Sequence, residues 1–545
     1  MSLDVPLRAP SPELQHRYRA EHLWLDRSLG GFFDDYLARG ADLEVRFWSE
    51  TAPYRGTFGD VHREARRFAG GLQARGIAIG DVVTYQLPNR VEAMIALYGA
   101  AMAGAVVVPV VHFYGPKELQ FILEQLGARV HLTTATFGSS RYLDALDGFR
   151  TDVATLEHIV LVGDGTAPWT EPFADVLSAA PLDDLPSTDP MAPAIIGYTS
   201  GTTSDPKGVV HVANSFVAEA LQMKDYDVGR SRPLLTGAPL AHAMGITGGA
   251  VLPLMRHEPS HLVDRWEPDR VLAIMLEAGL SSGSGATYFL TSLFDAATFT
   301  PAHAEIMEGV GLGGSTVPGA VCDRAEDLGV VAVRSYGSTE HPTSIGAVRS
   351  DTPEHRKYTE GRPLAGCEVR IVDDAGRDIS DGVAGEILSR GPDLFFGYVD
   401  PMLTRTALDR DGWYHTEDLA IRDPDGYITI ADRKKDIIIR GGENISASEV
   451  EEILQRMPGV SEVAVVAAPD DRLGERGCAF VAPILGRTPP SLEDVRAHFR
   501  ESGVARQKWP EELRVVDQFP RTPSGKIKKQ VLRAELQDRA RSTTS

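Results

Sequence analysis

The chain has 545 residues, of which 43% are hydrophobic and 24% are charged, a balance typical of a globular protein with several domains. Its 55 basic and 76 acidic side chains give a net charge of −21, which disfavours nucleic acid or an anionic membrane as the main partner. The three cysteines are far apart, so they predict neither a disulfide framework nor a zinc cluster. With no basic and apolar leader at the start, we expect a cytoplasmic protein.

Apolar, β-rich runs alternate with helical patterns through the first part of the chain. This alternation predicts an α/β fold with stacked, mostly parallel sheets and helices. The uncharged stretch at residues 93–111 is long enough for a membrane span, but Gly104 and Pro109 divide it. We therefore expect a buried helix followed by a buried strand there. The β-rich runs are residues 82–87, 106–111, 158–162, 194–198 and 330–335.

The pattern changes in the last third of the chain. Residues 367–397 read as short strands and turns, which predicts a small antiparallel barrel or sheet, and residues 412–436 are rich in turn signals. Beyond them, a helix, a strand and a second helix are predicted at residues 447–457, 462–467 and 492–502. The sequence thus predicts a large domain of residues 1–432 and a small α+β domain of residues 433–545.

The strongest local motif follows the predicted strand at residues 194–198 and reads YTSGTTSDPKG from Tyr198 to Gly208. Its hydroxyl groups, backbone N–H groups and single lysine match the needs of triphosphate oxygens. It is not a Walker A loop, because Pro206 stands where that motif needs glycine and Gly208 where it needs serine or threonine. A surface turn is the alternative for any loop of this composition. The motif favours phosphate binding.

The same loop resembles the phosphate loop of the adenylate-forming superfamily, which includes acyl- and aryl-CoA synthetases, peptide-synthetase adenylation domains and luciferases. Any one such motif is weak, but seven in the superfamily's order are specific. The resemblance implies a carboxylic acid:CoA ligase of the acyl-CoA synthetase branch, using ATP, Mg²⁺ and coenzyme A. The other matching segments are PLAHAMG (239–245), YGSTE (336–340), GWYHTED (412–418), DRKKD (432–436), GGEN (441–444) and PRTPSGK (520–526).

The resemblance also implies roles for individual residues. The first domain would bind ATP and the acyl group, and the mobile second domain would carry the catalytic lysine. Lys526, Glu340 and His242 would be catalytic, with Glu340 also holding the metal. Lys435 would be the hinge, and Gly441, Gly442 and Glu443 would contact coenzyme A. The nucleotide would be bound by Thr199, Ser200, Gly201, Thr202, Thr203, Lys207, Tyr336, Thr339, Asp418 and Arg433.

Elementary electrostatics supports these roles. Attack of a carboxylate on the α-phosphate of ATP brings two anions together, so cations must be supplied. Mg²⁺ on Glu340 could neutralise the pyrophosphate, and Lys526 could bridge the two reacting groups. Asp418 could accept hydrogen bonds from the ribose hydroxyls. On its own, Lys526 would be interpreted as part of a solvated basic tail, because two more lysines follow closely.

Two positions depart from the superfamily pattern. Glu417 stands where glycine is usual, and it could raise the pKa of Asp418, crowd the ribose or point outward. Ala447 replaces a common proline after Asn444. These departures leave open an alternative, an enzyme that only forms the adenylate and passes it to a partner protein. A non-catalytic nucleotide-binding regulator would differ from both by showing no acid-dependent exchange of pyrophosphate into ATP.

The segments that line the acyl pocket in the superfamily are rich in small residues here. Room in the pocket predicts a bulky, alicyclic or medium-to-long acid, although glycine equally serves close backbone packing. No aspartate stands out as a partner for an amino-acid ammonium group. Small molecules are therefore the expected partners, with no nucleic acid and no membrane span, and a homodimer is left open. The pocket glycines are Gly245, Gly248, Gly283, Gly313 and Gly314.

Two further motif matches are interpreted as structural. Residues 257–261 (HEPSH) match the zinc-protease pattern, but Pro259 stands inside the helical turn that would have to align both histidines. Residues 279–283 (GLSSG) match the nucleophile elbow of serine hydrolases, but a helix at residues 269–278 is predicted where that elbow needs a strand. A serine hydrolase would cleave esters without ATP.

Overall fold

The computed structural model describes residues 5–199, 205–470, 472–484, 486–522 and 526–543. Its main sheet has the strand order β11-β10-β4-β3-β5-β8-β9 and is parallel except for the β10–β11 pair. This confirms the predicted α/β class. The strands are β3 (Val82–Gln86), β4 (Val106–Pro109), β5 (Val130–Thr134), β8 (His158–Val162), β9 (Glu171–Pro172), β10 (Pro193–Thr199) and β11 (Lys207–Val212).

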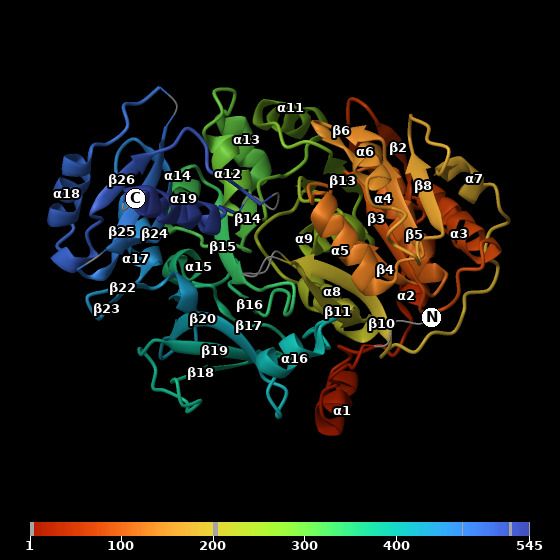
Figure 1. Cartoon of the computed structure of the whole chain (residues 1–545), viewed down its shortest axis with the longest axis horizontal. Coiled ribbons are helices and arrows are strands. Elements are labelled where there is room, and N and C mark those ends of the chain that lie inside the picture. Colours follow the sequence, from red (N-terminus) through yellow and green to blue (C-terminus); the bar gives the residue numbers. More distant parts are fainter. Residues whose placement is uncertain (1–4, 200–204, 471, 485, 523–525, 544–545) are drawn as a thin grey trace.

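Helices cover both faces of this sheet (Figure 1). Neighbouring strand residues point to opposite sides, so Val82 and Val106 pack in one apolar core with α5, and Val83 and Val107 pack in another with α2, α3 and α4. Parallel strands buried on both faces read as continuous apolar runs, which is why the sequence revealed them. The helices are α2 (Leu29–Arg39), α3 (Phe58–Ala74), α4 (Val91–Met102) and α5 (Pro116–Leu126).

Two further sheets complete this part of the chain. In one, the order is β12-β13-β1-β2, and β1 pairs in parallel with β13 although more than two hundred residues separate them in the sequence. In the other, the order is β14-β15-β16-β17. The strands are β1 (Glu44–Trp48), β2 (Tyr54–Thr57), β12 (Leu235–Thr236), β13 (Ser260–Val263), β14 (Gly309–Leu312), β15 (Val331–Tyr336), β16 (Ile345–Gly346) and β17 (Arg362–Pro363).

The uncharged stretch at residues 93–111 forms the buried helix α4 and the buried strand β4, as predicted. Among the described residues, no helix is both long and apolar enough to cross a membrane. The remaining helices of this part are α1 (Pro12–Ala20), α6 (Tyr142–Asp147), α7 (Phe173–Leu177), α8 (Ala213–Lys224), α9 (Ala243–Gly245), the π-helical η1 (Ile246–Val251), α10 (Leu252–Arg256), α11 (Pro268–Ala278), α12 (Thr287–Phe294), α13 (Pro301–Met307), α14 (Gly319–Asp327) and α15 (Pro353–Tyr358), and a small hairpin joins β6 (Thr136–Phe137) to β7 (Ser140–Arg141).

The small barrel expected after residue 366 is not closed. In the described chain it is an open antiparallel sheet of order β18-β19-β20-β21, whose outer strands do not pair with each other. The segment at residues 412–436, expected to be mainly turns, contains two of these strands. The buried positions of these strands include Asp418 and Asp432, which broke the apolar alternation expected of a strand. The strands are β18 (Glu368–Val372), β19 (Gly385–Arg390), β20 (Tyr414–Arg422) and β21 (Ile428–Arg433).

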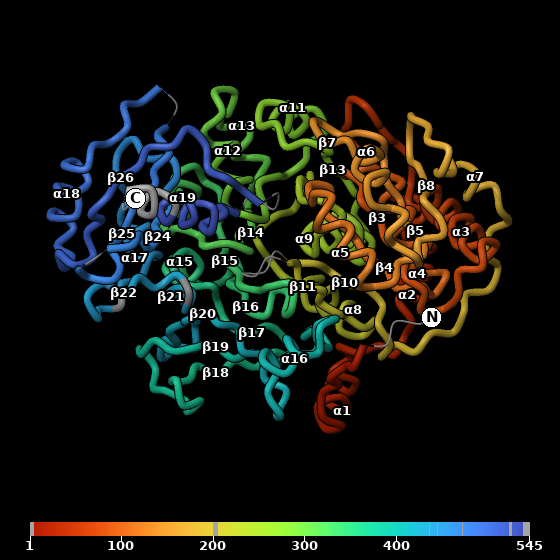
Figure 2. Tube along the Cα trace, in the orientation of Figure 1, coloured from red at the N-terminus to blue at the C-terminus, as the bar shows by residue number. Residues whose placement is uncertain are grey.

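The C-terminal part forms its own sheet, which shares no strand with the others in the described chain. The order is β23-β22-β25-β24, with β26 added to β25, and helices pack on both faces (Figures 1 and 2, blue). The predicted α+β pattern is confirmed. The elements are β22 (Ile438–Arg440), β23 (Glu443–Ile445), α17 (Ala447–Gln455), β24 (Val460–Asp470), β25 (Gly474–Pro483), α18 (Leu492–Glu501), η3 (Arg506–Lys508), β26 (Glu512–Val515) and α19 (Lys529–Thr543).

Direct contacts join the C-terminal part to the rest. Glu452 of α17 accepts a hydrogen bond from the N–H of Gly319 at 3.0 Å, and the Ser461 hydroxyl donates to Asp295 at 3.1 Å. Both contacts are made to the region of α12 to α14, which lies beside the C-terminal sheet in Figures 1 and 2. The C-terminal part is therefore docked on the region that also carries β14 and β15.

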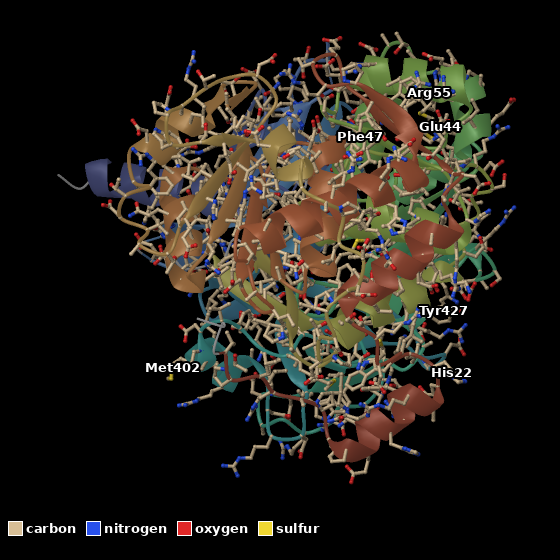
Figure 3. All side chains as sticks on the ribbon, turned by 90° about the vertical axis from the view of Figure 1, so that its right-hand side faces the viewer. His22, Glu44, Phe47, Arg55, Met402 and Tyr427 are labelled. Atoms are coloured by element: carbon tan, nitrogen blue, oxygen red, sulfur yellow. The ribbon has the colours of Figure 1, made fainter. Side chains whose placement is uncertain are left out.

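Many charged side chains at the surface form ion pairs. Glu44 of β1 and Arg55 of β2 lie close together in Figure 3, and their ion pair measures 2.6 Å from Oε1 to Nε. Met402 of α16 (Pro401–Ala407) is 61% exposed and points away from the molecule in the same view. Such single apolar side chains at a surface are ordinary and need no functional explanation.

Candidate functional site

Lys526 is hydrogen-bonded to Thr522 and lies close to the N-terminal part. The backbone N–H of Lys526 donates to the Thr522 hydroxyl at 3.0 Å, and the N–H of Thr522 donates to the Lys526 carbonyl at 2.7 Å. Its Cε lies 3.9 Å from where a Cβ would stand on Gly314. Burial, together with the nearby Arg433, lowers the pKa of Lys526 to about 8, although Asp418 and Glu340 act in the opposite direction. Lys526 is thus close to charged residues of three other segments.

Asp418 lies where three strands meet. It sits on β20 opposite Arg433 of β21, whose Nε is 3.0 Å from its Oδ1. The hydroxyl of Tyr336, the last residue of β15, donates to Oδ2 at 2.6 Å. Burial, followed by the charge of Asp418, raises the pKa of Tyr336 well above its usual value, so the phenol is a neutral donor. Asp418, Tyr336 and Arg433 therefore form one hydrogen-bonded group beside Lys526.

Glu340 lies in the loop after β15 and is 8% exposed. Its Oε1 accepts a hydrogen bond from the Tyr398 hydroxyl at 2.7 Å. The Nζ of Lys207, the first residue of β11, lies 5.7 Å from the centre of the Tyr398 ring. The preceding residue, Thr339, is fixed through its carbonyl by His211 at 2.7 Å. Tyr398 was not identified from the sequence, because no motif marks it.

The predicted phosphate loop is the connection of a hairpin. Thr199 ends β10 and pairs in register with Lys207, which begins β11. Ser200, Gly201, Thr202 and Thr203 lie outside the described residues. Their proposed contacts with phosphate therefore stay predictions. Strand β10 of this hairpin passes next to Thr339. A Cβ on Gly197 would be 3.1 Å from the Thr339 methyl group.

His242 caps the short helix α9, and its Nδ1 accepts from the N–H of Met244 at 3.3 Å. Burial and the nearby Lys526 lower the pKa of His242 to about 4, so its ring is neutral at pH 7. Met244 extends toward Gly285 and Gly314, where added Cβ atoms would be 2.9 and 3.2 Å from it. Beyond Met244 lies an apolar group formed by Ala238, Trp266, Ala286, Tyr288 and Phe289.

The pocket glycines fall into two groups. A Cβ on Gly245 would be 2.0 Å from the Pro239 carbonyl oxygen, and one on Gly313 would be 2.6 Å from the Ser335 hydroxyl, so close packing explains both. Gly283 has a φ of +93° and therefore serves the backbone. A Cβ on Gly248 would meet only the Thr236 hydroxyl at 4.0 Å, and Gly314 lies between Met244 and Lys526. Gly314 thus borders both Met244 and Lys526, whereas Gly248 has open space beside it.

The predicted hinge and coenzyme A residues lie on the C-terminal side of β21. Lys435 falls in the 3₁₀ turn η2 (Lys434–Asp436). Gly441 and Gly442 form the two-residue turn of the β22–β23 hairpin and have φ values of +57° and +89°. Such a turn requires positive φ at both positions, which accounts for the glycines. The roles of Lys435, Gly441, Gly442 and Glu443 stay predictions.

Glu417 points away from the Asp418 group. Its side chain is exposed, and its backbone N–H donates to the Glu386 carboxylate at 3.3 Å. Its φ is +61°, a left-handed conformation that favours glycine. Of the three outcomes left open by the sequence, the structure supports the outward one.

Replacing Glu417 with glycine is expected to increase the free energy of unfolding by about 0.5–1 kcal/mol. Glycine relieves the steric cost of the positive φ, about 1–2 kcal/mol. Its greater loss of entropy on folding offsets about 0.5–1 kcal/mol of that gain. Nucleotide affinity should stay unchanged. Chemical denaturation and nucleotide titration would measure both. Glu417→Ala is the control: it removes the same charge but keeps the Cβ, so it should not stabilise. Equal stabilisation by both variants would contradict backbone strain as the cause.

The HEPSH and GLSSG segments, which match catalytic motifs, both have structural roles. His257 ends α10 with a φ of +55°, whereas His261 lies in β13, so the pair does not share a helix face. In the GLSSG segment the buried hydroxyls of Ser281 and Ser282 donate at 3.0 Å to the carbonyl oxygens of Met307 and Leu235. Neither serine is available as a nucleophile. The structure therefore agrees with the interpretation of both motifs as structural.

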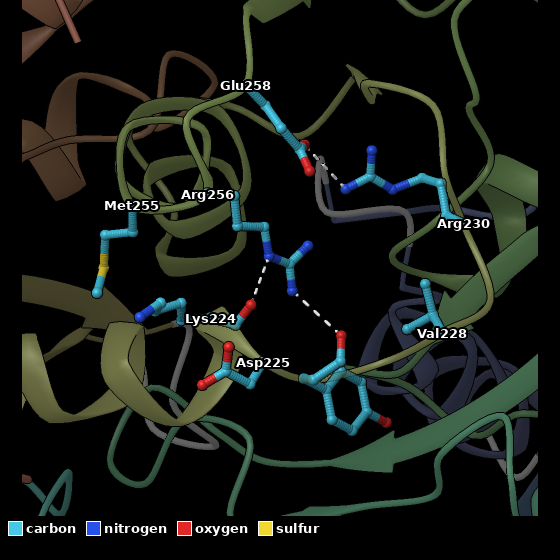
Figure 4. A pocket seen from close by; sticks show the side chains of 8 residues that line it. Lys224, Asp225, Val228, Arg230, Met255, Arg256 and Glu258 are labelled. Carbon is cyan, nitrogen blue, oxygen red and sulfur yellow. Dashed lines mark hydrogen bonds and ion pairs between the residues drawn. The ribbon is translucent and has the colours of Figure 1, made fainter.

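A surface hollow of about 410 Å³ lies next to the HEPSH segment and is lined by Glu258 from it (Figure 4). Arg256 donates to the carbonyl oxygens of Lys224 and Tyr226 at 2.8 and 3.1 Å, and Arg230 pairs with Glu258 at 3.3 Å. Both guanidinium groups are thus engaged with the protein itself. None of the predicted site residues lines this hollow, so it is separate from the candidate site.

Known proteins match nearly the whole length of the chain. The profile of the family "AMP-binding enzyme" matches residues 37–399, and that of "AMP-binding enzyme C-terminal domain" matches residues 449–526. The chain is 35% identical over 530 residues to a medium-chain fatty-acid–CoA ligase of Escherichia coli K12, covering 96% of this chain and 93% of the relative. It is 32% identical to 3-[(3aS,4S,7aS)-7a-methyl-1,5-dioxo-octahydro-1H-inden-4-yl]propanoyl:CoA ligase of Rhodococcus jostii RHA1, covering 88% and 93%.

Solved structures agree on the fold. The anthranilate CoA ligase AuaEII in complex with anthranoyl-AMP is 23% identical, with a TM-score of 0.84 over 95% of this chain and 98% of the other. ATP-bound MatB from Rhodopseudomonas palustris is 24% identical, with a TM-score of 0.80 over 92% and 98%. At this level of identity the likeness shows a shared two-domain architecture.

Proposed function

Because the chain belongs to the AMP-binding enzyme family and is an AMP-forming acyl-CoA synthetase, we propose that it activates a bulky or medium-to-long apolar carboxylic acid and transfers it to coenzyme A. The position of Lys526 carries this proposal. A single ammonium group from the C-terminal part lies near Glu340, Asp418 and His242, which belong to separate segments of the N-terminal part. That arrangement suits a reaction between a metal-bound triphosphate and a carboxylate.

The first half-reaction is the attack of the carboxylate on the α-phosphate, which releases pyrophosphate. Protonated Lys526 would hold the two anionic groups together and stabilise the charge that spreads in the transition state. Its burial makes this interaction stronger than it would be in water. His242, neutral because its pKa is about 4, adds no second positive charge beside the lysine. Arg433 and Asp418 would bind the nucleotide, with Asp418 accepting from the ribose hydroxyls.

Glu340 fits the magnesium site that the family implies. Tyr398 holds one of its carboxylate oxygens, which leaves the other for a cation. Mg²⁺ is often bound by one or two carboxylates, with phosphate oxygens and water completing the shell. When bound, Mg²⁺ would neutralise charge on the triphosphate. Lys207, close to Tyr398, would contact the same phosphate groups.

The second half-reaction would transfer the acyl group to the thiol of coenzyme A, with AMP as leaving group. Relatives covering nearly the whole chain are named as CoA ligases, which supports both steps on this chain over adenylation alone. The hinge at Lys435 would exchange the Lys526 turn for the Gly441–Gly442 hairpin between the steps. Separate measurement of AMP ester and thioester products distinguishes the two alternatives: adenylate without thioester would contradict the second step.

The nature of the acid follows from the apolar group beside Met244. Its side chains, Trp266, Tyr288 and Phe289 among them, are uncharged. Two relatives are named for a medium-chain fatty acid and for a bicyclic propanoic acid. An apolar acid would gain the free energy of burying its surface there. The decisive experiment is a screen of acids for AMP release: apolar acids should be active and amino acids inactive, and no activity with any acid would contradict the proposal.

Replacing Gly248 with leucine is expected to lower kcat/KM for bulky acids by about 10-fold or more while sparing short acids. The new side chain would start in open space, because a Cβ at this position would be 4.0 Å from the Thr236 hydroxyl. One or two displaced methylene groups are worth about 1–3 kcal/mol. Steady-state kinetics with acids of increasing size would measure the effect. Gly248→Ala is the graded control with a smaller loss. A uniform loss with every acid would show that Gly248 does not border the pocket.

The pH dependence of adenylation should report Lys526. The amine must be protonated to bridge two anions, and its pKa is lowered to about 8, first by burial and then by Arg433. We expect kcat/KM for adenylation to decrease about tenfold per pH unit above pH 8, because kcat/KM reports the free enzyme. Pyrophosphate release across the pH range would measure it. In Lys526→Arg this alkaline limb should disappear, and its persistence there would assign the ionisation to another group.

A further inference from the structure

A second cluster of ligand-type side chains lies directly behind Glu340. The Nε2 of His341 is 3.2 Å from Oδ1 of Asp393, and the Sγ of Cys367 is 3.7 Å from that nitrogen and 3.5 Å from that oxygen. The three residues come from the loop after β15, the position just before β18 and the loop after β19. His341 and Asp393 are 2% and 0% exposed. No role in adenylation accounts for this cluster.

The spacing of these three atoms matches a tetrahedral metal site. Zinc binds cysteine sulfur at about 2.3 Å and histidine nitrogen or carboxylate oxygen at about 2.0 Å, which places ligand atoms about 3.3–3.5 Å apart. The observed separations of 3.2, 3.5 and 3.7 Å lie within or close to that range. Thiolate and imidazole ligands also select zinc over magnesium or calcium.

The centre of the cluster is kept clear of protein atoms by a glycine. A Cβ on Gly391 would be 2.6 Å from the His341 Nε2 and 2.9 Å from both the Cys367 Sγ and the Asp393 Oδ1. Such an atom would take the space between all three ligand atoms. The backbone at Gly391 does not have a positive φ, so conformation does not require glycine there. Space for an ion explains the residue.

The local charge also calls for a cation. Among the described residues, Oδ2 of the buried Asp393 has no hydrogen-bond partner. Within the described part of the chain, this carboxylate has no lysine or arginine within ion-pair distance. Buried carboxylates without compensation are costly. A divalent ion between His341, Cys367 and Asp393 would supply the missing positive charge.

The surrounding residues are arranged as they are around known metal ligands. The Nδ1 of His341 is 2.8 Å from the buried Ser389 hydroxyl, which can accept its proton and leave Nε2 free to bind a metal. The amide of Gln222 donates to the Cys367 Sγ at 3.2 Å and would stabilise a thiolate. Cys367 is itself partly exposed, which provides a route of entry for an ion.

We propose that His341, Cys367 and Asp393 bind one divalent transition-metal ion, with Zn²⁺ preferred. This ion is distinct from Mg²⁺ at Glu340 and does not touch the reacting atoms. It positions Glu340, because His341 is its neighbour in sequence and the N–H of Phe395, two residues after Asp393, donates to the Glu340 carbonyl at 2.8 Å. The ion would tie three loops together beneath the nucleotide site.

Elemental analysis of protein purified without a metal-affinity column is the first test. The expected result is about one zinc per chain. Cobalt exchanged into the site should show a thiolate-to-metal charge-transfer band, because Cys367 would be a ligand. Cys367→Ser should lose that band and weaken metal binding by about 100-fold, because losing a ligand costs at least as much as losing a residue that supports one, which is about 10–100-fold. Cys322→Ser and Cys478→Ser are controls at the two buried cysteines outside the cluster and should keep both.

Gly391→Ala provides an independent variant, since its methyl group would fill the ion's place while leaving every ligand intact. It should abolish metal binding. Wild-type protein that contains no metal and shows no cobalt spectrum would overturn the proposal and leave a hydrogen-bonded His341–Asp393 pair. Cobalt spectra unchanged in Cys367→Ser would overturn it as well. Both readouts are independent of ligase activity, so they remain decisive whatever acid the enzyme uses.

Discussion

Adenylate formation in Lys526→Ala is expected to be about 10²–10³-fold slower than in the wild type, whereas thioester formation from a synthetic acyl-adenylate should be retained. The amine is the group from the C-terminal part that lies near Glu340 and Asp418. Removing one preorganised donor from a water-poor site costs about this factor. Acid-dependent exchange of pyrophosphate into ATP would measure the first step, and thioester formation from the synthetic adenylate would measure the second.

Lys528→Ala is the matched control for this experiment. Lys528 is exposed and only two residues away, so its removal changes the net charge equally without reaching the site. Its adenylation rate should equal that of the wild type. If the two variants were equally active, Lys526 would be part of a solvated basic tail, the alternative that the sequence left open. Equal loss of both half-reactions in Lys526→Ala would instead indicate a structural role.

Lys435→Pro is expected to reduce thioester formation by about 10²-fold and to leave adenylate formation nearly unchanged. The residue lies in the 3₁₀ turn between β21 and β22, where the C-terminal sheet begins. Proline fixes φ near −65°, which is compatible with a 3₁₀ turn but removes the freedom to rotate. A misplacement of the reacting groups costs about this factor. Stopped-time product analysis would separate adenylate from thioester.

Lys435→Ala is the control, because it removes the same side chain but leaves the backbone free. Both half-reactions should be close to normal in this variant. Undiminished thioester formation in Lys435→Pro would contradict a hinge at this position. Loss of adenylation in the proline variant would mean that the turn itself had been disturbed, and the position of Lys526 would then have to be re-examined by its pH profile.

Much of the fold could be predicted from the sequence, for a clear physical reason. The strands of the main sheet are buried on both faces, so residues 82–87 and 106–111 read as unbroken apolar runs. The strands β20 and β21 were missed because charged residues, Asp418 and Asp432, occupy buried positions in them and interrupt the apolar alternation. Of the two forms predicted for the small sheet, the open sheet rather than the closed barrel was found, because pairing of its outer strands depends on contacts that local patterns do not contain.

The candidate site, too, was predicted from the sequence only in part. Motifs located Lys526, Glu340 and Asp418, but only their resemblance to a family suggested that they meet. Tyr398 was missed because it carries no motif. The His341–Cys367–Asp393 cluster was missed because successive ligands stand 26 residues apart on different loops, whereas zinc motifs are recognised by short spacings. Three scattered cysteines therefore suggested the absence of a zinc site.

The parallel pairing of β1 with β13 has a consequence for biosynthesis. A ribosome adds about 5–20 residues per second, so β1 waits roughly 10–40 seconds before β13 has been made. Meanwhile the backbone edge of β1 that will pair with β13 is unpaired on the nascent chain. The strand also carries the apolar side chains Phe47 and Trp48, which are buried in the finished fold. Unpaired edges of this kind promote aggregation. Yield in a heterologous host should consequently depend on translation speed and on chaperones that shield nascent strands.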